Sequence, residues 1–169
     1  MSDRLPAVFD PASFADKRRH LVGDVPLDSL DRLADLLLDK TGDAHLDLQF
    51  GRSGRLAWIS GRVRSDLVLQ CQFCLGPIPW PVDSALHLGV VTSVDEALRL
   101  PDSIEALIVG AGEEVSLADI VQDELLLAIP TIPRHADCRA SGSGIPAQTS
   151  RPNPFAELAR LKKDLSSQE

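Results

Sequence analysis

The sequence predicts an α+β fold: a mainly antiparallel meander sheet with two to three helices and a flexible C-terminal tail. Between residues 44 and 90, apolar and polar side chains alternate along long stretches, a pattern typical of half-buried strands. Residues 117–129 instead repeat apolar side chains at helical spacing. Because short turns connect the strands, we expect sequential strands to pair antiparallel.

The first expected element is a helix over residues 27–38, which Thr41-Gly42 is expected to end. Its apolar positions at helical spacing are Leu27, Leu30, Ala34 and Leu37. No element is predicted for residues 1–20, which are polar and include the basic run Lys17-Arg18-Arg19-His20.

Two hairpins are expected next. Residues 44–50 and 56–71 are predicted strands, and the sequence GRSG between them is turn chemistry. One face of the second strand carries Ala57, Ile59, Gly61 and Val63, and the other carries Leu56, Trp58, Ser60, Arg62 and Arg64. Alternation over residues 82–90 predicts a third strand, so that the turn from Cys71 to Cys74 lies in the second hairpin.

The last elements of the folded part are a loop over residues 93–103, a short strand over 104–109 and an amphipathic helix over 117–129. Ser116 is expected to cap this helix and Pro130 to stop it. We expect the acidic side chains of the helix to be solvated: Asp119, Asp123 and Glu124.

The domain organisation follows from composition. Residues 1–138 are predicted to form a single α+β domain. Residues 139–152 are rich in Ser, Gly and Pro and are interpreted as a flexible linker. Residues 153–169 are predicted to form a C-terminal amphipathic helix or tail, with Asn153 as its cap and Pro154 at its first position.

The charge of the chain is unevenly distributed. The net charge is −8, yet residues 93–124 alone hold nine acids and one base, which is −8, and the remainder balances at 16 acids and 16 bases. A neutral remainder with local arginine clusters can meet a phosphate backbone. The sequence has neither a run long enough to span a membrane nor a secretory signal at its start, so we expect a cytoplasmic protein with no membrane partner.

Cysteine spacing indicates a possible metal site. Cys71 and Cys74 form one half-site, and His135 with Cys138 forms a second. Three thiols and one imidazole are a ligand set that zinc accepts. The alternative is that these are buried small residues and a surface histidine, because the spacing alone does not show that the half-sites meet. A thioredoxin-like redox pair is excluded, since the proline-rich segment after Cys74 cannot form the required helix.

Basic and aromatic residues supply candidates for RNA contact. An aromatic side chain beside arginines on one strand face can stack a base and hold phosphates. The candidates are Trp58, Arg62, Arg64, Arg52, Arg55, Lys17, Arg18 and Arg19. The alternative is a solvated sheet face with Trp58 covered by a helix. No nucleophile–base pair is present in the pattern, so no catalytic residue is assigned and we expect a protein that is not an enzyme.

Several stretches together resemble the YceD family, bacterial proteins named for accumulation of large-subunit (23S) ribosomal RNA. They are residues 10–15, 67–75 (LVLQCQFCL), 121–130 (VQDELLLAIP), His135 with Cys138, and 151–162 (RPNPFAELARLK). The resemblance implies a non-enzymatic factor in 23S ribosomal RNA synthesis, processing or stability. Its implied partners are ribosomal RNA or a precursor of the 50S particle, with ribosomal or assembly proteins as further partners.

A second hypothesis is a small zinc-stapled module for protein–protein interaction, without direct RNA contact. In this hypothesis the segment after residue 152 acts as a docking peptide on a flexible tether. Metal content and RNA affinity discriminate between the two hypotheses.

Overall fold

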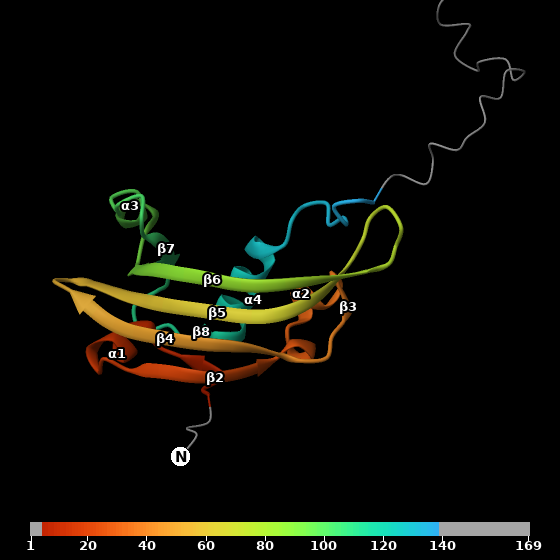
Figure 1. Ribbon diagram of the computed structural model, residues 1–169. Helices are drawn as coiled ribbons and strands as arrows, with labels where there is room; N and C mark the ends of the chain where they lie inside the picture. The colour runs from red at the N-terminus through yellow and green to blue at the C-terminus, as the bar shows by residue number, and fades with distance from the viewer. Residues whose placement is uncertain (1–4, 139–169) are drawn as a thin grey trace, which may run out of the picture. The chain divides into compact units, whose positions relative to one another are not determined.

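The computed structural model of the chain describes residues 5–138. The predicted linker over 139–152 and the predicted tail over 153–169 lie outside these residues. Within them a long twisted sheet runs through the molecule (Figure 1). Its strands, in spatial order, are β2 (His20–Pro26), β4 (Asp43–Ser53), β5 (Leu56–Gln70), β6 (Pro77–Val91) and β7 (Glu105–Ile108), and β3 (Leu37–Asp39) also pairs with β5.

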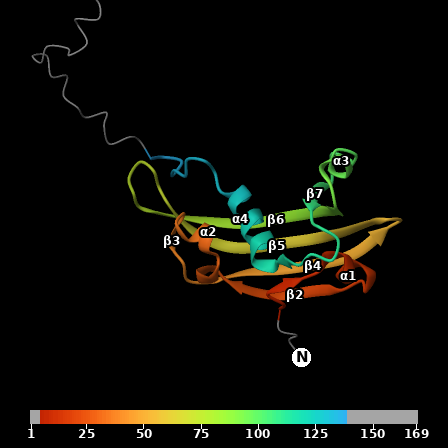
Figure 2. The same cartoon turned by 180° about the vertical axis from the view of Figure 1, so that it is seen from behind.

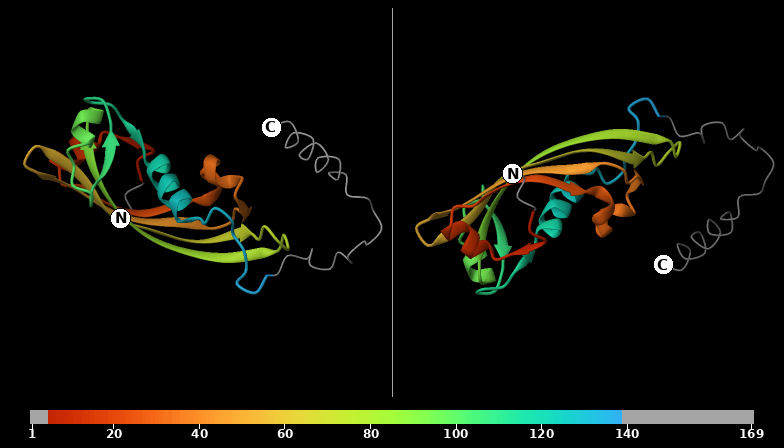
Figure 3. Two further views of the ribbon diagram at one scale, coloured as in Figure 1. Left: turned by 90° about the horizontal axis from the view of Figure 1, so that it is seen from above. Right: turned by 90° about the horizontal axis from the view of Figure 1, so that it is seen from below.

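One face of the sheet is covered and the other is open. The helices α1 (Pro11–Asp16), α2 (Asp31–Ala34), α3 (Val94–Ala97) and α4 (Leu117–Ala128) lie on the covered side, as the views from behind and from above show (Figures 2 and 3). A two-stranded sheet of β1 (Val8–Phe9) and β8 (Val115–Ser116) leads the chain into α4. Within residues 5–138, no helix is both long and apolar enough to cross a membrane.

The core lies between α4 and the covered face of the sheet. Leu46 and Leu48 of β4, Ile59 of β5, and Val121 and Leu125 of α4 have no exposed surface. Each such side chain contributes roughly 1.5–3 kcal/mol through burial of apolar surface. The fold class predicted from the alternating pattern is therefore confirmed.

The two predicted hairpins are present, and the faces of β5 are those predicted. Strand β5 pairs antiparallel with β4 on one side and with β6 on the other. Ile59 and Val63 point into the core, whereas Arg62 and Arg64 are exposed on the open face. The alternation is clear because only one face of these strands is packed.

The helix predicted over residues 27–38 is wrong. The structure has a 3-10 turn at Leu27–Ser29, the single helical turn α2, and then the strand β3. Leu30 and Leu33 are both fully buried. The leucine spacing therefore satisfies burial without one continuous helix, and Leu37 continues as a strand because it pairs with Leu69 of β5.

The region after β6 departs from the prediction in two ways. The expected loop over 93–103 contains the short helix α3, whose first turn is capped by the Ser93 hydroxyl accepting the Glu96 N–H. The predicted strand is present as β7, but it runs parallel to β6 and so ends the meander. A parallel pair needs a crossover connection, and α3 belongs to that connection.

The N-terminal elements had no counterpart in the sequence prediction. Helix α1 begins with Asp10 accepting the N–H groups of Ala12 and Ser13. It ends where the Arg18 N–H reaches the Ala15 carbonyl and the Arg19 N–H reaches the Phe14 carbonyl. This pair of bonds is a Schellman motif, in which the residue at the position of Arg18 takes a left-handed conformation. Strand β2 then follows.

Helix α4 is where it was predicted, with the Ser116 hydroxyl accepting the Asp119 N–H. Two of its polar side chains are buried. Gln122 accepts the N–H groups of Arg32 and Leu33 and so caps α2. Glu124, expected to be solvated, is only 7% exposed and accepts the Ser84 hydroxyl at 2.8 Å. Burial raises the pKa of the Glu124 carboxyl above its ordinary value.

Candidate metal centre

The turn between β5 and β6 carries two thiols. Cys71 follows directly after β5 and is fully buried, whereas Cys74 is exposed. The turn is closed by the Cys71 N–H donating to the Gly76 carbonyl and by the Leu75 N–H donating to the Cys71 carbonyl, both at 2.9 Å. Leu75 has φ +60°, a left-handed conformation that turns the chain back into β6.

The segment after α4 brings the second half-site to this turn. The Gln72 N–H donates to the Pro133 carbonyl at 2.9 Å, which holds the two chain segments together. The His135 ring nitrogen Nε2 lies 3.0 Å from the Pro77 carbonyl oxygen. Because a carbonyl only accepts, Nε2 carries the ring proton and Nδ1 keeps its lone pair free for a ligand.

The four predicted ligands form one cluster. Their donor atoms all lie within 4.8 Å of one another. The sulfurs of Cys71 and Cys138 are 3.7 Å apart, and the Cys74 sulfur is 3.5 Å from Nδ1 of His135. A tetrahedral zinc ion with its usual bond lengths places two sulfurs about 3.8 Å apart and a sulfur about 3.6 Å from a nitrogen. The distances and donor types therefore fit a tetrahedral metal ion.

Local electrostatics support the same conclusion. The backbone N–H of Cys74, helped by those of Phe73 and His135, lowers the pKa of the Cys71 thiol to about 5. Burial raises the pKa of Cys138 to about 11, with the neighbouring sulfurs of Cys71 and Cys74 adding to the effect. The turn therefore stabilises the Cys71 thiolate, whereas ionisation of Cys138 beside it is unfavourable. A bound dication would supply the missing positive charge.

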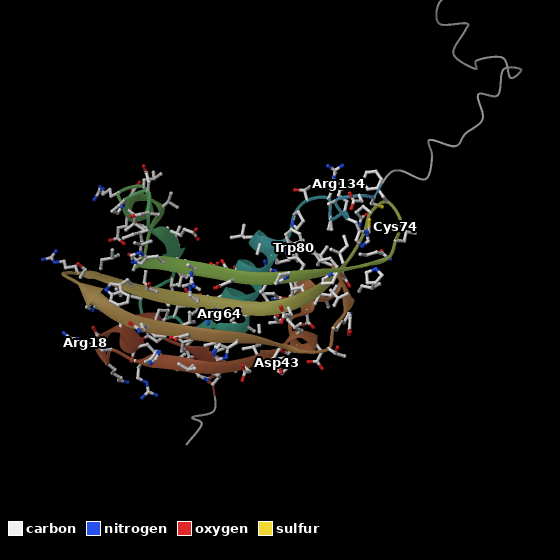
Figure 4. The ribbon with its side chains drawn as sticks, viewed as in Figure 1. Arg18, Asp43, Arg64, Cys74, Trp80 and Arg134 are labelled. Atoms are coloured by element: carbon white, nitrogen blue, oxygen red, sulfur yellow. The ribbon has the colours of Figure 1, made fainter. Side chains whose placement is uncertain are left out.

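The cluster lies at one end of the sheet. Figure 4 shows Cys74 and Arg134 at the β5–β6 turn, Arg18 at the opposite end and Arg64 between them. The end of α4 is tied to β6 nearby, where the Trp80 indole N–H donates to the Ala128 carbonyl at 3.0 Å. Within residues 5–138, all four ligand positions come from protein side chains, which is the arrangement of a structural site.

Six of the eight predicted RNA-contact residues fall into two groups. Arg62 and Arg64 both pair with the Asp83 carboxylate at 3.3 Å. The other group gathers at the β4–β5 end, where a hollow of about 430 Å³ is lined by four of the predicted candidates, Arg18, Arg19, Arg52 and Trp58. Trp58 is half-buried on the open face rather than covered by a helix.

Sequence reasoning missed several residues that complete this hollow. His20, Gln49 and Gly51 also line it. His20 bonds to Asp47 at 2.7 Å across the β2–β4 pair. These residues come together through the pairing of β2 with β4. A strand predicted over the residues of β2 would have pointed to them, and none was predicted.

Comparison with known proteins agrees with the resemblance. The sequence model of a family described as "Large ribosomal RNA subunit accumulation protein YceD" matches residues 59–162, a segment that includes all four cluster residues. A curated protein with that same description, from Haemophilus influenzae, is 32% identical over 169 residues, covering 95% of this chain and 97% of the relative. No solved structure matches the chain. On the match over most of its length, the chain belongs to the YceD family.

Proposed function

We propose that this chain is a non-enzymatic factor in the accumulation of large-subunit (23S) ribosomal RNA, and so in ribosome biogenesis. It acts in the cytoplasm on ribosomal RNA or on a precursor of the 50S particle, with ribosomal or assembly proteins as further partners. The observation that supports the proposal is the similarity over 95% of the chain to a relative named for large ribosomal RNA subunit accumulation.

Two features of the described residues support a role without catalysis. The cluster of three thiols and one imidazole offers four protein ligands, so a metal ion held there would lack the open position that a catalytic metal keeps for water or substrate. Among residues 5–138, the buried carboxylate Glu124 bonds to a serine hydroxyl and has no histidine partner. A structural element that presents a surface fits this chain better than an active site.

We further propose that the cluster binds zinc. Cys71, Cys74, His135 and Cys138 would hold the ion, which would fasten the segment after α4 to the β5–β6 turn. Thiolate and imidazole ligands in a tetrahedral arrangement favour zinc over magnesium or calcium, which take oxygen ligands.

The zinc assignment predicts the metal content of the purified protein. Elemental analysis of full-length protein prepared without chelator is expected to find about one zinc ion per chain, with the thiols protected from alkylation until a chelator is added. Zinc far below one per chain, together with three freely reactive thiols, would show that the cluster holds no zinc.

The proposed function predicts a defect in ribosomal RNA balance. A strain lacking the gene is expected to contain less 23S relative to 16S ribosomal RNA, measured by electrophoresis of total RNA during rapid growth and after cold shock. Expression of the wild-type gene is expected to restore the ratio. Purified protein is expected to leave precursor RNA uncut. An unchanged ratio under both conditions would refute the proposal.

A further inference from the structure

The hollow at the β4–β5 end of the sheet combines positive charge with an aromatic ring. Three chain segments contribute to it: the turn after α1, strand β2, and the β4–β5 hairpin. Its main lining side chains are Arg18, Arg19, His20, Gln49, Arg52 and Trp58. It lies at the opposite end of the sheet from the metal cluster (Figure 4).

The charge in this hollow is largely uncompensated. Arg52 pairs with Asp16 at 2.5 Å. Across residues 5–138, no carboxylate forms an ion pair with Arg18 or Arg19. The Arg19 guanidinium instead lies over the Phe14 ring, 5.6 Å from its centroid, which holds the side chain without neutralising its charge. The hollow therefore attracts anions although the chain is acidic overall.

Arg18 occupies a position that favours glycine. Its φ is +48°, the left-handed conformation that closes the Schellman motif at the end of α1. A side chain there is strained, and glycine takes the same conformation without the clash at Cβ. The turn requires the left-handed conformation but not the arginine side chain, so an exposed arginine at this position points to a role for its guanidinium.

Trp58 is fixed in place by its own hairpin. It pairs across the strands with Gly51, and a Cβ on Gly51 would overlap the indole ring, so the ring lies against the glycine backbone. The His87 ring meets it edge-on, with centroids 6.5 Å apart. An aromatic ring held rigidly beside arginines offers a stacking surface at little cost in side-chain entropy.

A second hollow adjoins this one on the open face but is close to neutral. It has a volume of about 260 Å³, shares Gln49 with the first hollow, and is lined by Arg62, Arg64 and Asp47. The two arginines also pair with the Asp83 carboxylate, so two carboxylates face two guanidinium groups there. The excess positive charge therefore lies in the first hollow, around Arg18 and Arg19.

We propose that the hollow around Arg18 and Trp58 binds single-stranded RNA. One base stacks on Trp58, and the phosphates on either side of that base contact Arg18 and Arg19. A stacked base requires an unpaired strand, because the bases of a duplex are already stacked on one another. The identification of the polyanion as RNA rests on the proposed function, whereas the location and chemistry of the site rest on the geometry.

The test measures binding of fluorescein-labelled 12-nucleotide oligouridylate to the full-length, zinc-loaded protein by fluorescence anisotropy. Arg18→Gly is expected to weaken binding about tenfold at low salt and to reduce the slope of log affinity against log salt by about 0.7, the value for one phosphate contact on a single strand. Trp58→Leu is expected to weaken binding at least about fivefold without changing that slope.

Two further variants keep the result interpretable. Arg99→Gln removes the same charge from the exposed, acidic segment around α3 and is expected to bind like the wild type. Arg18→Gly is expected to melt at or above the wild-type temperature because it relieves strain, so its weaker binding cannot come from misfolding. If Trp58→Leu does not fold, Trp58→Phe is expected to fold and to lose only part of the affinity.

Several outcomes would overturn the inference. One is that Arg18→Gly and Trp58→Leu bind the oligonucleotide as tightly as Arg99→Gln. Another is that a duplex of the same length binds as well as the single strand. A third is that the protein fails to bind oligouridylate but binds an acidic peptide through Arg18, which would make the hollow a protein-docking site.

Rescue of the deletion strain separates this inference from the proposed function. If Arg18→Gly binds oligouridylate as tightly as Arg99→Gln while the deletion lowers the 23S to 16S ratio, the inference fails and the proposed function stands. If oligouridylate binding depends on Arg18 and Trp58 while the deletion leaves the ratio unchanged, the inference holds and the proposed function fails. If Arg18→Gly loses both RNA binding and rescue, both are supported.

Discussion

Replacing Cys71 by serine is expected to release the metal and to lower the free energy of unfolding by several kcal/mol. A metal that binds only the folded state stabilises it by about 4 kcal/mol when its free concentration is a thousandfold above Kd. Cys71 is also fully buried, so a serine hydroxyl there loses solvation and adds about 1–3 kcal/mol to the loss.

Two matched variants separate the metal from the packing. Cys74→Ser removes a ligand that is exposed, so it is expected to lose the metal and only the metal-dependent part of the stability. Phe73→Ser changes the neighbouring residue in the same turn, which is 39% exposed and is not a ligand, and is expected to keep one zinc per chain. Urea unfolding and elemental analysis of the four proteins give the comparison.

The loss of structure on metal removal is expected to be local. Hydrogen exchange should increase at Gln72, whose N–H bonds to the Pro133 carbonyl, and remain slow along the paired part of β5. This follows because the metal would join one turn to one segment, whereas the core between α4 and the sheet is built from packed apolar side chains. Equal metal content and equal stability in wild type and Cys71→Ser would contradict the assignment.

The metal-dependent stability is expected to fall as the pH is lowered. The Pro77 carbonyl raises the pKa of His135 above its ordinary value by accepting a hydrogen bond from the ring, and the Cys71 sulfur acts in the same direction. Metal binding needs a free Nδ1, so stabilisation is present above this raised pKa and is lost as the pH falls through it. Cys138, with a pKa of about 11, must also release a proton to bind.

The strands could be predicted because their burial is local and periodic. Along β5, residues such as Ile59 and Val63 are buried while Arg62 and Arg64 face the solvent, so the sequence itself records which face is packed. The parallel pairing of β7 with β6 could not be predicted in this way. Alternation indicates that a strand exists but says nothing of the partner beside which it lies.

The helix predicted over residues 27–38, which the structure does not contain, shows the same limit of local sequence patterns. Leu30 and Leu33 are buried at a spacing that a continuous helix and a series of short turns satisfy equally well. What decides between them is distant in sequence: Gln122 of α4 caps the turn at Arg32, and Leu69 of β5 pairs with Leu37. Local propensity is overridden here by partners that only the folded chain brings together.

The two candidate sites differ in how much the sequence reveals. The ligand types and the spacing within each half-site could be recognised in the sequence. Only the proximity of the two half-sites, which are some sixty residues apart in the chain, needed the structure. The basic hollow was visible merely as scattered residues. The pairing of His20 with Gln49 brings the turn after α1 beside the β4–β5 hairpin, and that register depends on a strand that the sequence did not indicate.

Gly61 leaves no room for a Cβ against the backbone of β4, and Gly61→Ala is expected to destabilise the protein by about 2–3 kcal/mol. Gly61 pairs with Leu48 of β4. A Cβ at this position would overlap the Asp47 carbonyl oxygen and would lie 2.9 Å from the Leu48 Cα. These atoms are backbone and cannot rotate away, so the strands must separate and weaken the pairing of β4 with β5.

Ser60→Ala is the matched control, because Ser60 is the adjacent residue on the open face and its replacement is expected to change stability by less than about 0.5 kcal/mol. Urea unfolding should lower the midpoint of Gly61→Ala with an unchanged slope. A midpoint equal to that of the wild type would mean that β4 and β5 tolerate a wider separation than the structure shows. A normal midpoint for Ser60→Ala and a low one for Gly61→Ala would place the constraint in the backbone contact itself, since the two substitutions affect neighbouring positions of one strand.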